Sequence, residues 1–133
     1  ENLHKALKKM CKISIKTIKR NQKKFDYAYL HIKETDIPGH DNKPLEKKTM
    51  IEYIDKTLFS FLRKFAPQRK IKIMVTGDHS TPCKLKTHSA DPVPVLLYND
   101  SAPKEKMFNE REARKGILRK IIGKDLLKKT GFV

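Results

Sequence analysis

Apolar residues recur along the chain at two different spacings, and each spacing predicts a type of secondary structure. Three segments repeat apolar side chains every three or four residues, the period of an amphipathic helix, over residues 3–20, 46–66 and 109–122. Three shorter segments are rich in β-branched and aromatic side chains, which is typical of strands, over residues 25–32, 71–76 and 93–98. Asn109 is predicted to cap the third helix, with Glu112 in the capping-box position. The alternation of the segments predicts an α/β protein.

The segment 46–66 is the clearest amphipathic helix, and Pro67 is predicted to end it. It connects the strands expected at 25–32 and 71–76. A strand–helix–strand crossover joins parallel strands, so these two strands should run in the same direction. Pro94 gives the third strand an edge position or an irregular start. The predicted architecture is a three-layer αβα sandwich around a mainly parallel sheet.

Side chains that commonly ligate metals lie next to the predicted strands. Asp36 and His40 follow the first strand, with a Pro-Gly turn between them, and the adjacent Asp78 and His79 follow the second. His88 precedes the third strand and can fold back over the same edge. Carboxylate oxygens and imidazole nitrogens suit zinc or manganese. Either pair alone is more commonly a pair of solvated loop residues, so the metal hypothesis depends on whether these stretches meet.

The length and the composition narrow the class of protein. A chain of 133 residues with 38% apolar residues is sufficient for one modest domain. The sequence has no apolar run long enough to span a membrane, and since its first residues lack the pattern of a signal peptide we expect none. Cys11 and Cys83 are far apart and lie in no Cys-x-x-Cys pair, so we expect two reduced thiols in a cytoplasmic protein. The alternative is that Cys83 ligates a metal.

The net charge of +16 suggests an anionic partner such as nucleic acid, a phosphorylated metabolite or an acidic surface. A lysine-rich solvated surface explains the charge equally well, and no nucleic-acid-binding motif accompanies it. Residues 1–24 are strongly basic, with one apolar face. This segment is expected to pack its apolar stripe on a sheet. A membrane-surface helix, an anion-binding face and a crossover helix whose preceding strand is missing from this chain are the alternatives.

Four stretches together resemble cofactor-independent phosphoglycerate mutase of the archaeal type, a family in the alkaline phosphatase-like superfamily. They are HIKETDIPGHD at 31–41, VTGDHSTP at 75–82, HSADPVPVLLY at 88–98 and FNEREARKGILRKIIGKDLL at 108–127. The resemblance implies an isomerase of glycolysis and gluconeogenesis. Such an enzyme interconverts 3-phosphoglycerate and 2-phosphoglycerate through a phosphoserine intermediate, without 2,3-bisphosphoglycerate.

The resemblance also implies two divalent ions, manganese or zinc. Asp36, His40 and His88 would bind the first ion, and Asp78 and His79 would bind the second. In the family the ions polarise the phosphoryl oxygens and activate the serine hydroxyl, which is the general logic of two-metal sites.

The sequence departs from the family in one respect: the motif of the nucleophilic serine is absent. In the family that serine and a further aspartate ligand lie in the N-terminal half, and Ser80 and Ser89 do not match its position. The chain therefore looks like a C-terminal portion, with residues 1–24 as a helix leading into the C-terminal part of the catalytic domain at 25–133. Alone it should bind metal weakly and lack mutase activity. We expect the N-terminal portion as its partner, with no membrane association. Uncovered apolar surface would favour self-association.

Two other functions remain open on the sequence. The metal residues also suit a different phosphatase or phosphotransferase of the same superfamily, because they serve the chemistry and not the substrate. A basic nucleic-acid-binding module with incidental metal residues is the second alternative. Binding to DNA or RNA that falls steeply with salt and ignores chelators would favour it.

Overall fold

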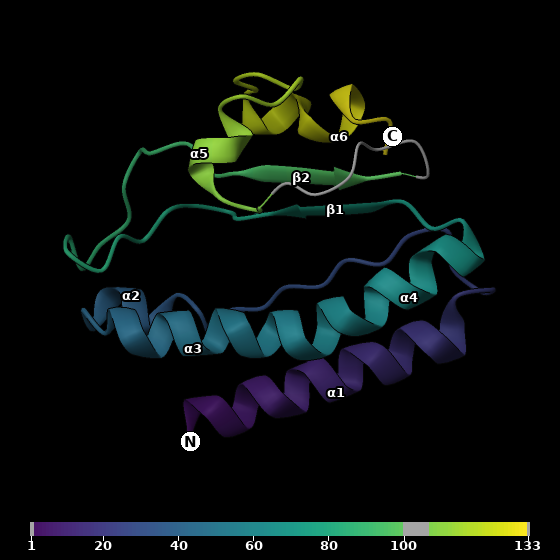
Figure 1. The fold of residues 1–133 in the computed structure, drawn as a ribbon, viewed down its shortest axis with the longest axis horizontal. Coiled ribbons are helices and arrows are strands. Elements are labelled where there is room, and N and C mark those ends of the chain that lie inside the picture. The colour runs from purple at the N-terminus through teal and green to yellow at the C-terminus, as the bar shows by residue number, and fades with distance from the viewer. Residues whose placement is uncertain (1, 100–106, 133) are drawn as a thin grey trace. The chain divides into compact units, whose positions relative to one another are not determined.

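The computed structural model describes residues 2–99 and 107–132. The chain divides into two compact units. The first unit contains Glu1–Phe65 and Thr81–Ser89, and the second contains Ala66–Ser80 and Ala90–Val133. The helices and strands are coloured along the chain in Figure 1, and each unit is described separately.

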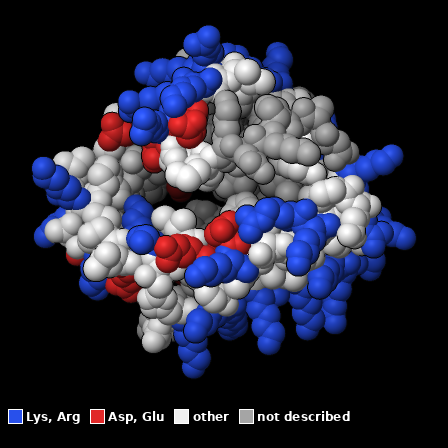
Figure 2. Space-filling model, in the orientation of Figure 1, with Lys and Arg blue, Asp and Glu red and all other residues white. Residues whose placement is uncertain are grey.

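The first unit begins with α1 (Leu3–Asn21), the helix that the sequence predicts over 3–20. The Asn2 side chain caps it by accepting hydrogen bonds from the backbone N–H groups of His4 and Lys5, at 3.1 and 3.3 Å. The apolar stripe of α1 faces inward, while its lysines are exposed. Figure 2 shows lysine and arginine side chains gathered where α1 lies in Figure 1.

The helix predicted over 46–66 is present as three consecutive helical segments. They are α3 (Pro44–Ile54), the π-helical turn η1 (Asp55–Phe59) and α4 (Ser60–Arg69), whose last residues belong to the second unit. The prediction that Pro67 ends this helix is wrong, because α4 continues to Arg69. The end comes at Lys70, which has a φ of 53°. The N–H groups of Lys70 and Ile71 bond to the carbonyls of Pro67 and Ala66, a Schellman motif that stops the helix.

The core of the first unit is formed between α1 and the α3–η1 segment. Leu7 and Cys11 of α1 pack with Met50, Ile54 and Leu58, and the exposed fraction of each side chain is below a tenth. The apolar stripe of α1 thus packs on other helices rather than on a sheet. Burial of such side chains is the main source of stability in a unit of this size.

The strand predicted over residues 25–32 is not formed in the described part of the chain. The segment has no regular secondary structure and takes part in no β-ladder there. Several of its large side chains face solvent, with exposed fractions of 65% for Phe25, 52% for Tyr27 and 71% for Tyr29. A strand needs a neighbour for its backbone hydrogen bonds, and the described sheet does not supply one to this segment.

The second unit contains β1 (Ile73–Thr76) and β2 (Val95–Tyr98), within two of the predicted strands. They pair antiparallel, with Ile73 opposite Tyr98 and Thr76 opposite Val95. This two-stranded sheet is the only sheet within residues 2–99 and 107–132, so the predicted mainly parallel sheet is not found there. The connection between β1 and β2 contains no crossover helix, and without one the chain returns antiparallel.

The helix predicted over 109–122 is also shorter than expected, since α5 covers only Glu110–Ala113. The cap is as predicted: the Asn109 side chain accepts the backbone N–H of Glu112 at 2.9 Å. A tight turn follows, in which the Gly116 N–H bonds to the Ala113 carbonyl, and glycine is a poor helix former. A short 3₁₀ turn and a last helical turn complete the unit, as η2 (Gly123–Asp125) and α6 (Leu126–Lys129).

Across the described ranges, every helix is too short or too polar to cross a lipid bilayer.

Candidate metal centre

The short helix α2 (Ile37–His40) positions two of the candidate ligands. Asp36 is its N-cap residue and His40 its last residue, so the two side chains are four positions apart and lie on one face. The backbone N–H groups of Gly39 and His40 bond to the Asp36 carbonyl at 2.8 and 3.2 Å. Pro38 fits the first turn because its missing N–H would have no partner there. The Asp36 Oδ2 and His40 Nε2 atoms are 3.4 Å apart.

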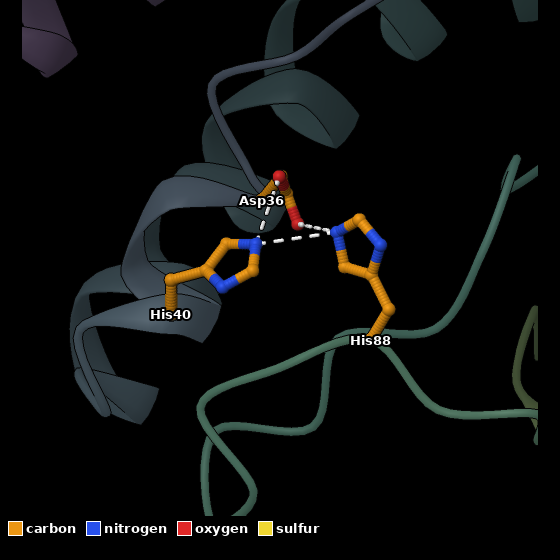
Figure 3. Close-up of side chains that lie close together, drawn as sticks. All are labelled: Asp36, His40 and His88. Carbon is orange, nitrogen blue, oxygen red and sulfur yellow. Dashed lines mark hydrogen bonds and ion pairs between the residues drawn. The ribbon is translucent and has the colours of Figure 1, made fainter.

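His88 completes a cluster of three from a loop that is distant in sequence but belongs to the same unit (Figure 3). Its Nε2 lies 3.2 Å from His40 Nε2 and 4.0 Å from Asp36 Oδ1. One ligand atom from each residue lies within 4.8 Å of the others. Among the described residues, this is the one cluster of three or more potential metal ligands. We call Asp36, His40 and His88 the triad.

Two of the three distances within the triad fit a tetrahedral metal ion, and the third, 4.0 Å between His88 Nε2 and Asp36 Oδ1, is longer. Around a tetrahedral zinc with Zn–N bonds of about 2.0–2.1 Å, neighbouring ligand atoms are about 3.3 Å apart. The Nε2–Nε2 distance of 3.2 Å and the Nε2–Oδ2 distance of 3.4 Å are close to this value. The donor set of one carboxylate and two imidazoles is also typical of zinc and of other divalent transition metals. The site is partly open, since the two histidine side chains are 40% and 52% exposed.

A backbone carbonyl sets the orientation of His40. The Lys86 carbonyl oxygen lies 3.1 Å from His40 Nδ1. Because a carbonyl can only accept, Nδ1 carries the hydrogen, and in the neutral ring Nε2 then has the free lone pair. A hydrogen bond of this kind on the far nitrogen is the usual support of a metal-binding histidine. It comes from the loop that also carries His88.

Asp78 and His79 follow β1 and belong to the second unit. His79 Nε2 lies 3.5 Å from Asp78 Oδ2, and the His79 backbone N–H donates to Asp78 Oδ1 at 3.0 Å. The Asp78 side chain is 59% exposed. In the described structure this pair belongs to no cluster of three potential ligands.

Sequence reasoning missed Thr81 and Lys47 beside the triad, and it gave Gly39 only a role in the turn. Thr81 donates a hydrogen bond to Asp36, Lys47 donates one to the Thr81 carbonyl, and Gly39 lies directly against Thr81. The only available signal was that Thr81 and Gly39 occur inside the stretches that carry the candidate ligands. Cys83, the alternative ligand, instead directs its thiol at the Pro38 carbonyl at 3.8 Å.

A family model described as the metalloenzyme superfamily matches residues 2–130. Among curated proteins, the chain is similar to 2,3-bisphosphoglycerate-independent phosphoglycerate mutases. The protein from Pyrococcus horikoshii is 42% identical over 107 residues, which cover 79% of this chain and 26% of that protein. The one from Saccharolobus islandicus is 45% identical over 114 residues, covering 81% of this chain and 26% of that protein.

The fold is also similar to a solved structure of the PH0037 protein from Pyrococcus horikoshii. The TM-score is 0.75 at 38% identity, and the match covers 91% of this chain but 36% of that one. The chain thus spans about a quarter of the length of the curated relatives it matches.

Proposed function

The chain belongs to the metalloenzyme superfamily, and from this premise we propose that it is the metal-binding portion of a cofactor-independent phosphoglycerate mutase. The single observation that carries the proposal is the triad, in which two imidazoles and a carboxylate converge from separate segments of one unit. The named relatives, at about 40% identity, supply the substrate class, phosphoglycerate.

We assign the first of two divalent ions, manganese or zinc, to Asp36, His40 and His88, and the second to Asp78 and His79. When bound, such ions polarise phosphoryl oxygens and lower the pKa of a hydroxyl nucleophile. The role of this chain's residues is to hold the ions: Asp36 supplies the negative charge, and the Lys86 carbonyl keeps the Nε2 lone pair of His40 available. The second pair would need at least one further ligand.

The nucleophilic serine is proposed to come from an N-terminal portion, which would also supply most of the contacts to phosphoglycerate. In this proposal Ser80 and Ser89 are loop residues without a catalytic role, and the chain alone has no mutase activity. Residues 1–24 lead into the C-terminal part of the catalytic domain, at 25–133. The two free cysteines suit a cytoplasmic location, where thiols stay reduced.

The complete enzyme is proposed to have the three-layer αβα sandwich with a mainly parallel sheet. Residues 25–32 would become one of its strands, because the segment has the composition of a strand, forms no helix, and exposes its aromatic side chains. Adding neighbouring strands would bury those side chains and satisfy the backbone. In the chain alone, without those strands, the same exposed apolar surface would favour self-association.

A chimera tests the mutase assignment directly. In it, this chain replaces the matching segment of the Pyrococcus horikoshii relative, and ³¹P NMR follows 3-phosphoglycerate with Mn²⁺ and without 2,3-bisphosphoglycerate. We expect 2-phosphoglycerate to form, His40→Ala to abolish its formation, and His4→Ala to leave it unchanged. His4 is the matched control, a partly exposed histidine of the same unit that pairs with Glu46. A folded, Mn²⁺-binding chimera without isomerase activity would contradict the assignment.

A phosphatase or phosphotransferase is the second candidate, because the superfamily match is broader than the mutases. The same chimera distinguishes the two. Release of inorganic phosphate from p-nitrophenyl phosphate, without isomerisation of phosphoglycerate, would favour the second candidate.

A further inference from the structure

One buried hydroxyl contacts the triad without belonging to it. Thr81 is 5% exposed, and its Oγ1 lies 2.6 Å from Asp36 Oδ1. The carboxylate can only accept when ionised, so the threonine hydroxyl donates. The distance is that of a charge-assisted O–H···O⁻ bond, one of the stronger hydrogen bonds found in proteins.

Thr81 is itself held in place from two directions. The Lys47 ammonium donates to the Thr81 carbonyl oxygen at 2.9 Å. On another side the Thr81 backbone lies against Gly39, where an added Cβ would come within 2.7 Å of the Thr81 carbonyl oxygen and 3.0 Å of its Cγ2. A side chain at position 39 would therefore displace Thr81. Gly39 lies between the two ligands of α2, so the same short helix that presents Asp36 and His40 also receives Thr81.

As a result, the two carboxylate oxygens of Asp36 have different polar neighbours. Oδ1 accepts from Thr81, and Oδ2 is the oxygen that approaches His40 Nε2, at 3.4 Å. A carboxylate with one oxygen fixed loses most of its freedom to rotate. Oδ2 is then directed at His40, and Oδ1 is also the oxygen nearest to His88, 4.0 Å from its Nε2, before any ion arrives. Such preorganisation lowers the entropy that ordering the ligands would otherwise cost.

We propose that Thr81 is a positioning residue for the metal centre: it orients the Asp36 carboxylate, and Lys47 and Gly39 hold it in place. The inference rests on the proposed function, since it takes the triad to be a metal site. It adds a role that neither the ligand spacing nor the relatives' names assign.

The test is the affinity for Mn²⁺ alone, measured by isothermal titration calorimetry on the chain and on matched variants. Thr81→Val keeps the shape of the side chain and removes the hydroxyl, and we expect it to weaken binding by about 10- to 100-fold, the usual effect of removing a partner of a metal ligand. Thr81→Ser restores the hydroxyl and should bind within about threefold of the wild type. Thr57→Val is the control, because Thr57 is a partly buried threonine of the same unit whose hydroxyl bonds to the Tyr53 carbonyl. It should also bind within about threefold.

The visible spectrum of bound Co²⁺ supplies a readout of ligand geometry. We expect Thr81→Val to change its band positions and Thr81→Ser to keep them. Equal affinity and equal spectra for wild type and Thr81→Val would overturn the inference and leave the metal site standing. If the wild type binds no Mn²⁺, both the metal site and the inference fall. If Thr81→Val does not fold, as judged by circular dichroism, Lys47→Met decides instead: weaker binding supports the inference, and unchanged binding overturns it.

Discussion

Two parts of the chain present an aspartate and a histidine, and the surroundings of the two pairs differ sharply. Asp36 and His40 lie one helical turn apart on α2, with a third ligand, a buried hydroxyl and a backbone carbonyl around them. Asp78 and His79 are neighbours after a short strand, and they contact each other through the His79 ring and backbone N–H. The Nε2 and Oδ2 atoms are almost equally close in the two pairs, at 3.4 and 3.5 Å, so the spacing of the two residues does not make the difference. What distinguishes the first pair is a third ligand, His88, from another segment of the same unit. The triad is preformed within one unit, and the second pair is not.

The largest expected effect is on Mn²⁺ affinity when one ligand of the triad is removed, compared with removal of one residue of the second pair. His40→Ala should weaken Mn²⁺ binding at the first site by at least about 100-fold, since the change deletes one of three protein ligands and its partners cannot replace it. His79→Ala should leave the tightest site within about threefold. Calorimetric titration of both variants measures this. A loss of the tight site in His79→Ala would reverse the assignment of the preformed centre.

The next largest expected effect is the loss of stability when the core of the first unit is altered. Leu7 is fully buried between α1 and α3, so Leu7→Ala should lower the free energy of unfolding by about 2–5 kcal/mol. Leu45 is 78% exposed, and Leu45→Ala should change it by less than about 0.5 kcal/mol. Urea unfolding followed by circular dichroism gives both values. Similar losses in the two variants would mean that the helical core does not support the unit as described.

Metal should stabilise the unit that holds the triad. At a free Mn²⁺ concentration 100 times the dissociation constant, the free energy of unfolding should rise by about 2.7 kcal/mol, because the ion binds the folded state only. A chelator should reverse the gain, and His40→Ala should abolish it. Thermal melts with and without Mn²⁺ measure the effect. A gain that persists in His40→Ala would place the stabilising ion outside the triad.

The smallest expected effect is a decline in the stability of the first unit at alkaline pH, caused by a cysteine in its core. Burial raises the pKa of the Cys11 thiol, partly offset by a hydrogen bond with Thr57. Below the ordinary thiol pKa both states are protonated and stability is unaffected. As the pH rises above it, the unfolded thiol ionises first, so the free energy of unfolding falls until the folded pKa is passed. Cys11→Ala should remove this decline, which should be smaller than the effect of Leu7→Ala. An identical alkaline decline in Cys11→Ala would assign it to other groups.

The spacing of apolar residues and the capping residues correctly predicted the elements that depend on residues close together in the chain. The apolar period located α1 and the long α3–η1–α4 segment, and the Asn109 cap is where the sequence places it. The patterns were wrong for elements that need a hydrogen-bonding partner from another segment of the chain. Residues 25–32 have strand composition, yet the described chain offers them no strand to pair with. Proline at 67 costs one hydrogen bond in the last turn of α4, which the Schellman end at Lys70 tolerates.

The sequence by itself determined the ligand types, the helical spacing of Asp36 and His40, and the family resemblance. The first two depend on residues close together in the chain, and the resemblance depends on the identity and order of four short stretches, not on their contacts. Only the tertiary structure decided that His88 meets this pair and that Thr81 and Lys47 stand behind Asp36. Those contacts join residues separated by 34 to 48 positions. No local preference encodes such a separation. It follows from the packing of the loop against α2, where the absence of a side chain at Gly39 lets the two backbones approach.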